Sequence, residues 1–342
     1  MATVKDIANR VGVSIGTVDR ILHNRGRFSR VTADKVWKAV EELQYSPNVS
    51  ARNLSKSKSL HIGVLIPFAD QGDNYWGQPL LGMQKAAEEL RGYQASLDVF
   101  GFKRDNRHEF ILAAQEMFKK ELDGYLMAPI FSEDSRQLLD RFHPKHPVVF
   151  FNTDVPNCNR ICFIGQNSYR SGEVAARLLE LLTKSSNEAH YLIIRANIDN
   201  KHLQDRVLGF RNRTRHRHVS EMVYEIGNIE KEELYLHALE EYISPNTTGI
   251  FVTDASVYRV ADYLKVHALK NSIALVGCDL TKQNADRLEQ ESLDIILTQR
   301  PVEMGYQGVY LLYKHLILHE KLEDRIVMPI DIITKENYEF FM

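Results

Sequence analysis

The stretch SIGTVDRILHNRG (residues 14–26) combines hydrogen-bonding side chains with a helical pattern of apolar ones. Val18, Ile21 and Leu22 recur at helical spacing and are expected to point inward. The outward positions are then Ile15, Gly16, Asp19, Arg20 and His23. A helix that enters the major groove of DNA needs polar groups at its N-terminal end for base edges, and donors around them for phosphates. The stretch therefore favours contact with DNA, and an ordinary solvated surface helix is the alternative.

Two further helices are predicted to hold this stretch in place. The preceding run, TVKDIANRV, has Thr3 as a candidate N-cap and Asp6 in the first turn, and Gly12 is expected to end it. Its apolar face is expected to comprise Val4, Ile7, Ala8 and Val11. Ser14 should cap the second helix, with Thr17 in its first turn.

A third helix is predicted to start after Thr32 and to end before Pro47. Its expected buried residues are Val36, Val40 and Leu43, with Trp37 beside them. Three short helices with a glycine turn between the first two are typical of a helix-turn-helix unit. The alternative is a small helical bundle whose arginines only keep it solvated.

Length, composition and charge set limits on the rest of the chain. With 342 residues it suits two or three domains, and no run of 18 apolar residues could span a membrane. The first ten residues lack the apolar region of a secretory signal, and three cysteines (Cys158, Cys162 and Cys278) indicate a reducing compartment. Residues 1–60 carry a net charge of +6 and the remainder −8. We therefore expect a cytoplasmic protein with a polyanion-binding head on a body with another task.

Residues 1–67 resemble the head and hinge of the LacI/GalR family of bacterial transcription regulators. The matching pieces are TVKDIANRVGVS, GTVDRIL, YSPN and ARNLSKSKS leading into IGVLIP. The resemblance implies a hinge helix that folds only when the dimer sits on its operator, and a minor-groove leucine that corresponds to Leu54. The DNA-binding residues that it implies are Thr3, Ser14, Ile15, Gly16, Thr17, Asp19, Arg20, His23, Asn24, Asn48, Ala51, Arg52 and Leu54.

The recognition helix departs from the common family pattern. Many relatives read S-T-V-S-R, whereas this chain reads GTVDR at residues 16–20. Gly16 offers no side chain for readout, and Asp19 would repel a phosphate, so Asp19 either accepts from a cytosine amine or holds Arg20. Readout is therefore expected to rest on Ile15, Thr17 and Arg20.

From Leu60 onward, apolar strand-like runs alternate with amphipathic helical runs, which indicates parallel sheets with crossover helices. The predicted strands are 61–67, 95–100, 124–128, 148–152, 190–195, 222–226, 249–252, 273–278 and 295–298. The fold class we expect is an all-α helix-turn-helix head plus an α/β body of two doubly wound parallel-sheet subdomains. A ligand cleft would lie at the carboxyl ends of the strands.

The predicted domains are the head (1–46), a hinge helix and linker (47–60), and an effector-binding and dimerisation domain (61–334). The two subdomains of the last would span roughly 61–164 plus 300–328 and 165–299 plus 329–342. Most of residues 60–334 resemble periplasmic sugar-binding proteins of the ribose-binding type, through GDNYWGQPLLGMQKAAEEL, RVLGF, VGCD and TQRPVEMGYQG. The effector-binding residues that this resemblance implies are Asp73, Tyr75, Trp76, Asn152, Arg206, Thr253, Asp254, Asp279 and Gln299.

These residue types suit a sugar, because aromatic faces pack on its C–H patches while carboxylates, amides and a guanidinium match its hydroxyls. The competing interpretations are core positions for Tyr75 and Trp76, an ion pair of Arg206 with Asp205 or Asp199, and a helix cap for Asp254. Thr253 stands where relatives often carry asparagine, which weakens the expected contact with the ligand. Asn152 stands where aspartate is commoner, so a negative charge is missing there.

No other motif points to chemistry. Cys158 and Cys162 lack the spacing of a redox or zinc site, and the histidines of HPKHP and RHRH lack supporting carboxylates. No phosphate-binding motif, G-x-S-x-G motif or nucleophile–base pair is visible. We therefore expect no enzymatic activity, no cofactor and no metal.

The sequence thus predicts a sequence-specific transcription regulator, a repressor, whose affinity for DNA is controlled by a small polar ligand, a sugar or sugar derivative. It would act as a homodimer on a near-palindromic double-stranded DNA operator. A sugar-binding protein without a DNA function and a sugar-acting enzyme are the alternatives. The hinge motif and the lack of a signal peptide weigh against the first, and the lack of a catalytic pair weighs against the second.

Overall fold

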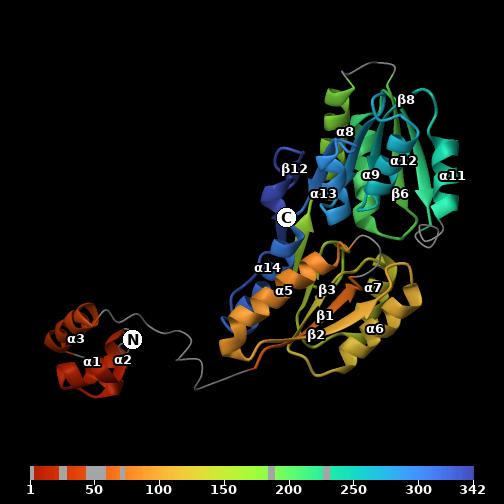
Figure 1. Cartoon of the computed structure of the whole chain (residues 1–342). Helices are drawn as coiled ribbons and strands as arrows, with labels where there is room; N and C mark the ends of the chain where they lie inside the picture. The colour runs from red at the N-terminus through yellow and green to blue at the C-terminus, as the bar shows by residue number, and fades with distance from the viewer. Residues whose placement is uncertain (1–3, 23–28, 44–58, 70–73, 184–188, 226–231) are drawn as a thin grey trace. The chain divides into compact units, whose positions relative to one another are not determined.

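A computed structural model describes residues 4–22, 29–43, 59–69, 74–183, 189–225 and 232–342. The chain forms two compact units, residues 1–57 and residues 58–342 (Figure 1). None of the described helices is long and apolar enough to cross a membrane.

The described residues of unit 1 form three helices, α1 (Val4–Val11), α2 (Ile15–Leu22) and α3 (Arg30–Glu42). Their buried core consists of Ile7, Ala8, Val18, Ile21, Ala33, Val36 and Ala39. Gly12 has a φ of +74°, and its amide donates to the Ala8 carbonyl at 2.9 Å, so the predicted glycine end of α1 is confirmed. The amide of Thr17 donates to Ser14 Oγ at 3.2 Å, which confirms Ser14 as the cap of α2.

Two details of the third helix differ from the prediction. It begins at Arg30, because Ser29 Oγ accepts from the Thr32 amide at 3.1 Å and so caps it earlier than expected. Trp37 is 48% exposed rather than packed beside Val36. Consecutive helical residues point about 100° apart, and alanines on the inner face of α3 fill the space instead.

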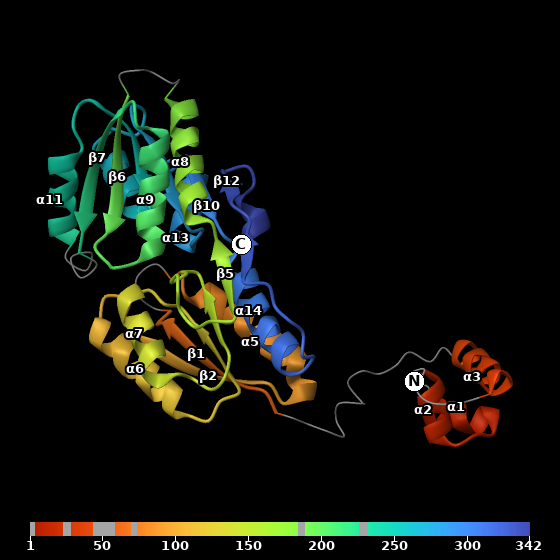
Figure 2. The same cartoon turned by 180° about the vertical axis from the view of Figure 1, so that it is seen from behind.

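Unit 2 contains two six-stranded sheets, each covered by helices (Figure 2). Sheet A has the order β11-β5-β4-β3-β1-β2, and all its strands are parallel. Its strands are β1 (His61–Pro67), β2 (Ser96–Phe102), β3 (Gly124–Met127), β4 (Val148–Phe151), β5 (Cys162–Gln166) and β11 (Arg325–Met328). We call the part built on sheet A lobe A. Its helices are α5 (Gly77–Glu89), η2 (Leu90–Tyr93), α6 (Arg107–Lys119), α7 (Ser132–Phe142) and α14 (Pro301–Leu316).

Sheet B has the order β12-β10-β9-β8-β6-β7 and is parallel except for its edge strand β12. Its strands are β6 (His190–Ala196), β7 (His218–Tyr224), β8 (Thr247–Val252), β9 (Ala274–Cys278), β10 (Ile295–Thr298) and β12 (Asp331–Ile333). The part built on it, lobe B, carries α8 (Ser168–Leu182), α9 (Lys201–Arg213), α11 (Glu232–Tyr242), α12 (Val257–Val266) and α13 (Lys282–Glu289). A short helix, η3 (Tyr338–Phe341), follows β12.

The predicted α/β body of two doubly wound sheets is therefore confirmed. All nine predicted strands are present, although β7 starts and ends earlier than expected. Strands β5, β11 and β12 were not predicted, because β11 and β12 are short edge strands of three or four residues, and Gly165 and Gln166 break the apolar run of β5.

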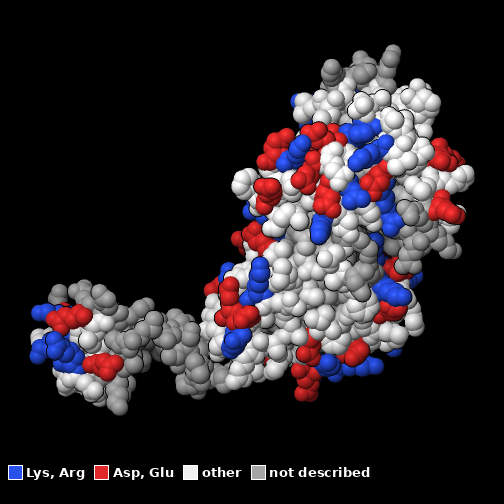
Figure 3. Space-filling model, in the orientation of Figure 1, with Lys and Arg blue, Asp and Glu red and all other residues white. Residues whose placement is uncertain are grey.

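Charge on unit 2 is mixed. On the face seen in Figure 3, Lys, Arg, Asp and Glu are interspersed around a largely uncharged central area. This face therefore shows no extended positive surface of the kind that binds a polyanion.

Candidate functional site

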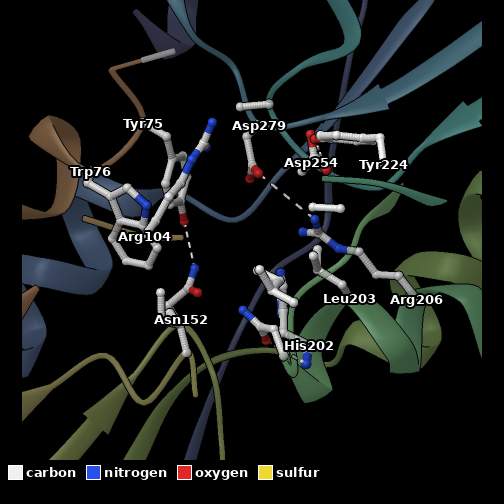
Figure 4. A pocket seen from close by; sticks show the side chains of 15 residues that line it. Tyr75, Trp76, Arg104, Asn152, His202, Leu203, Arg206, Tyr224, Asp254 and Asp279 are labelled. Carbon is white, nitrogen blue, oxygen red and sulfur yellow. Dashed lines mark hydrogen bonds and ion pairs between the residues drawn. The ribbon is translucent and has the colours of Figure 1, made fainter. Parts of the chain in front are cut away.

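A cavity lies between the two lobes, at the carboxyl ends of the strands (Figure 4). Its volume is about 60 Å³, room for a few water molecules. Lobe A contributes Tyr75, Trp76, Arg104, Ile130 and Asn152, and lobe B contributes Ala196, Ile198, Asn200, His202, Leu203, Arg206, Tyr224, Asp254, Ala255 and Asp279. Six of the predicted effector-binding residues therefore line one cavity.

Tyr75 and Trp76 precede α5 and are 5% and 7% exposed. Both belong to the core of lobe A and also line the cavity, so the core and ligand interpretations are compatible. Tyr75 Oη accepts hydrogen bonds from Asn152 Nδ2 and Gln299 Nε2, each at 2.8 Å. Burial, reinforced by the nearby Asp279 carboxylate, raises the pKa of Tyr75 well above its usual value, so its hydroxyl stays protonated.

Asn152 and Asp279 occupy equivalent places in the two lobes. Each directly follows a parallel strand, with a left-handed φ of 66° and 68° respectively. The backbone amide of each donates to the neighbouring strand, to Ile164 O at 3.0 Å and Leu297 O at 2.8 Å. Asn and Asp tolerate this conformation better than most residues do, so the same local turn carries a short polar side chain into the cavity from each lobe.

Arg206 lies on α9 and is fully buried. Its Nη1 donates to the Thr253 carbonyl at 2.6 Å and lies 3.9 Å from Asp279 Oδ2. Within the described parts of the chain, its Nε and Nη2 have no hydrogen-bond partner. The alternative ion pair with Asp205 is not formed, because Asp205 accepts from Lys201 Nζ at 2.7 Å. A buried guanidinium with an open bidentate edge is prepared for a ligand.

The crossing of α8 and α9 positions Arg206. A Cβ atom on Gly172 of α8 would lie 1.9 Å from the Arg206 carbonyl oxygen, so only glycine allows this approach. His202, one turn earlier on α9, is held by Ser168 across 2.6 Å. Burial, and then the charge of Arg206, holds the pKa of His202 well below its usual value, so the ring is neutral.

The other predicted residues lie at different depths. Asp254 faces the cavity and accepts from Tyr224 Oη and the Ser256 amide, each at 2.9 Å, so it also organises the turn before α12. Thr253 and Gln299 are fully buried but do not line the cavity; they hold Arg206 and Tyr75 from behind. Asp73 lies outside the described residues.

The sequence did not single out four polar residues that line the cavity: Arg104, Asn200, His202 and Tyr224. Arg104 and Asn200 follow β2 and β6 within a few residues, and Tyr224 ends β7. Their position just after strands was the available signal, since carboxyl ends of parallel strands form the cleft. His202 lies on α9, and whether its side chain faces the cavity depends on how that helix is oriented, which the spacing of residues does not reveal.

In unit 1, the structure places few of the predicted DNA-binding residues. Gly16 is exposed, and Ser14 Oγ and Thr17 Oγ1 form a hydrogen bond of 2.9 Å. Ile15, Asp19 and Arg20 belong to α2, but their side chains are not described. The predicted residues that lie outside the described parts are Thr3, His23, Asn24, Asn48, Ala51, Arg52 and Leu54.

Comparison with known families agrees with both units. Residues 62–321 match the periplasmic binding protein domain family, which defines the class of the body. Residues 3–48 match the family described as bacterial regulatory proteins, lacI family. The chain therefore belongs to the periplasmic binding protein domain family, and its head matches the lacI family of bacterial regulatory proteins, as the sequence predicted.

Curated relatives include the HTH-type transcriptional repressor PurR of Vibrio parahaemolyticus, 28% identical over 212 residues. That match covers 62% of this chain and 60% of the relative, so the chain spans about three fifths of the relative's length. The ribose operon repressor of Lactococcus lactis is 20% identical over 98% of both chains.

Solved structures share the fold. A putative LacI transcriptional regulator from Bacteroides fragilis has a TM-score of 0.76 and 23% identity, covering 83% of this chain and 100% of that one. The Lac repressor bound to ONPG has a TM-score of 0.66 and 19% identity, covering 97% and 98%. At these identities the likeness establishes the fold alone.

Proposed function

We propose that this protein is a ligand-responsive, sequence-specific DNA-binding repressor that acts in the cytoplasm as a homodimer. The observation that carries the proposal is the combination of a lacI-family head with a cavity in which the buried Arg206 keeps two donors without a partner among the described residues. Burying such donors is costly unless a polar ligand satisfies them. The head thus supplies the DNA-binding function and the cavity supplies the control.

The groups in the cavity favour a neutral hydroxyl-rich effector. Arg206 offers donors, while Asp279 offers a carboxylate 3.9 Å from Arg206 Nη1, beyond direct hydrogen-bond distance. A hydroxyl can accept from the first and donate to the second. A carboxylate or a fully deprotonated phosphate could not donate to Asp279, and an ammonium could not accept from Arg206. A sugar therefore matches this pair better than an anion or an amine.

For the head, we propose that residues 1–46 read DNA through Ile15, Thr17 and Arg20 at the start of α2. Residues 47–60 would form the hinge, with Leu54 as its minor-groove wedge. Two copies would place two such helices on a near-palindromic operator. Residues 61–334 would bind effector and pair the two copies, with the subdomain bounds predicted from the sequence.

The position of the cleft between the two lobes would couple effector binding to DNA binding. Effector bound between the lobes changes their relative angle, and this changes the spacing of the two hinge segments and so the free energy of DNA binding. The ligand can shift this equilibrium only by its difference in affinity for the two lobe arrangements.

The test is operator selection from random duplex DNA by the full-length protein, with Arg20→Ala and Leu54→Ala as comparison variants. We expect a palindromic site for the wild type that is lost or relaxed in both variants. Sugars are then screened, at fixed salt, for a change in affinity of the selected complex. If no sequence is enriched with or without sugars, the DNA-binding proposal fails; a sugar that binds without changing operator affinity contradicts the coupling.

A further inference from the structure

The hydroxyl of Tyr75, which lines the cavity, accepts hydrogen bonds from two buried amide side chains. Asn152 Nδ2 and Gln299 Nε2 both donate to it at 2.8 Å, and Gln299 Nε2 lies 3.4 Å from Asp279 Oδ1. Asn152 is 4% exposed and Gln299 is fully buried. Side chains of the types that suit ligand hydroxyls therefore converge on a hydroxyl of the protein itself.

An aromatic face alone would not require this arrangement. A phenyl ring at residue 75 could pack against a ligand equally well, but it would leave both amide groups without this acceptor. Buried amide donors are almost always hydrogen-bonded, because an unsatisfied donor keeps its full desolvation penalty. For the two amides, Tyr75 Oη thus takes the place that a ligand hydroxyl would take.

We propose that Tyr75 determines which sugar the cleft accepts, by filling with its own hydroxyl the subsite where Asn152 and Gln299 would otherwise hold a ligand hydroxyl. This inference rests on the proposed function of the cleft as a sugar site. The preferred ligand then lacks a hydroxyl at that position, as a pentose or a deoxy sugar does, and Arg206 and Asp279 hold its other end.

The experiment compares aldopyranoses with their counterparts that lack one hydroxyl or the hydroxymethyl group, such as D-galactose, D-fucose and L-arabinose. Calorimetry gives the dissociation constant of each sugar for the full-length wild type and for Tyr75→Phe. At one position, we expect the wild type to favour the sugar that lacks the hydroxyl. We expect Tyr75→Phe to shift that preference about 2- to 10-fold toward the parent sugar, the size of one net hydrogen bond.

Tyr125→Phe is the matched control. Tyr125 is buried in lobe A, and its hydroxyl donates to the Lys120 carbonyl at 3.4 Å, away from the cavity lining. It should leave every sugar ratio unchanged. If Tyr75→Phe does not fold, Tyr75→Met replaces it, because a flexible methionine adapts to irregular space, and the same shift is expected.

The outcomes of this experiment distinguish the role of Tyr75 from the proposed sugar-binding function of the cavity. Sugars that bind the wild type and both Tyr75 variants with the same ratios overturn the role of Tyr75 and leave the sugar site standing. A panel in which no sugar binds any of the proteins overturns the sugar site and this inference with it. A shift of equal size in Tyr125→Phe also overturns the inference, because the effect would then not belong to the cavity.

Discussion

Replacement of Arg206 by methionine separates a ligand-binding role from a structural one. Arg206→Met loses the bond from Nη1 to the Thr253 carbonyl, worth about 1.5–3 kcal/mol for a charged donor. It also removes two buried donor nitrogens, Nε and Nη2, that lack partners among the described residues, and each costs the fold about 1–3 kcal/mol. Asp279 loses the charge 3.9 Å from its Oδ2 but keeps the contact of its Oδ1 with Gln299 Nε2 at 3.4 Å. Losses and gains are then of similar size, so we expect the free energy of unfolding to change by less than about 2 kcal/mol.

The effect on effector affinity should be large. Two charge-assisted hydrogen bonds to a ligand at about 1.5–3 kcal/mol each correspond to a loss of about 100-fold or more. Urea denaturation measures the first quantity and calorimetry with the selected sugar measures the second.

Arg160→Met is the control for this prediction. The Arg160 side chain is only 8% exposed, so it is buried nearly as deeply as that of Arg206. Unlike Arg206, it donates to Asp154 at 2.7 and 3.0 Å and to Asp324 at 2.8 and 2.9 Å. Breaking this pair should cost about 3–5 kcal/mol of stability and leave effector affinity intact. If Arg206→Met instead loses stability on that scale and still binds sugar normally, Arg206 is a structural ion-pair residue and the reasoning is refuted.

Three further perturbations test other parts of the structure. Gly172→Ala places a Cβ atom 1.9 Å from the Arg206 carbonyl and should lower both the melting temperature and the effector affinity, whereas Gly92→Ala, with nothing within 4 Å of its Cβ, should change neither. The pKa of His202 is depressed in the folded protein, so below about pH 6.5 the unfolded chain binds more protons than the folded one. The free energy of unfolding should therefore fall there by up to about 1.4 kcal/mol per pH unit. In a denaturation series from pH 7.5 to 5.5, this fall with pH should be shallower for His202→Asn than for the wild type, and an equal fall would contradict a buried neutral ring. Ser14→Ala removes the cap of α2 and should cost about 0.5–2 kcal/mol in unit 1 and weaken DNA binding, while sugar affinity measured by calorimetry stays the same.

The fold could be predicted from the sequence where hydrophobic pattern and secondary structure coincide. Strand β1 (His61–Pro67) has the bounds expected for a buried parallel strand, because its apolar run is bounded by polar residues and a proline. The edge strands β11 and β12 could not be predicted, because each is short and partly exposed, and its pairing depends on strands far away in the sequence.

For the candidate site, the sequence predicted several residues that line the cavity, but not the hydrogen bonds that hold them. Asn152, Arg206 and Asp279 line the cavity, as expected from residues that follow strands or lie on α9. Sequence spacing could not show that Gln299 lies behind Tyr75, or that the Tyr75 hydroxyl is already bound by two amides. Those relations depend on packing between lobes, which no local pattern encodes.

Several hydrogen bonds join the two lobes, among them those from Gln299 Nε2 to Tyr75 Oη and from Gln78 Nε2 to the Leu280 carbonyl, each at 2.8 Å. The Ser132 amide, at the N-terminus of α7, donates to the Asp199 carbonyl at 3.3 Å, so lobe B supplies a cap for a helix of lobe A. Thr153 Oγ1 donates to Asn200 Oδ1 at 3.2 Å. Each bond contributes about 0.5–1.5 kcal/mol net, so these four bonds together favour closure by about 2–6 kcal/mol.

Repulsion across the same groove opposes closure. Its acidic residues come from both lobes: Asp105, Glu133 and Asp134 from lobe A, and Asp199 and Glu225 from lobe B, with Arg107 paired to Asp134. The hydrogen bonds between the lobes are therefore opposed by a repulsion that salt screens. A ligand that binds only the closed arrangement adds about 2.7 kcal/mol at a concentration 100-fold above its Kd, which exceeds either contribution of a single contact. A ligand that favours one lobe arrangement thus adds to the contacts that the protein already makes across the cleft.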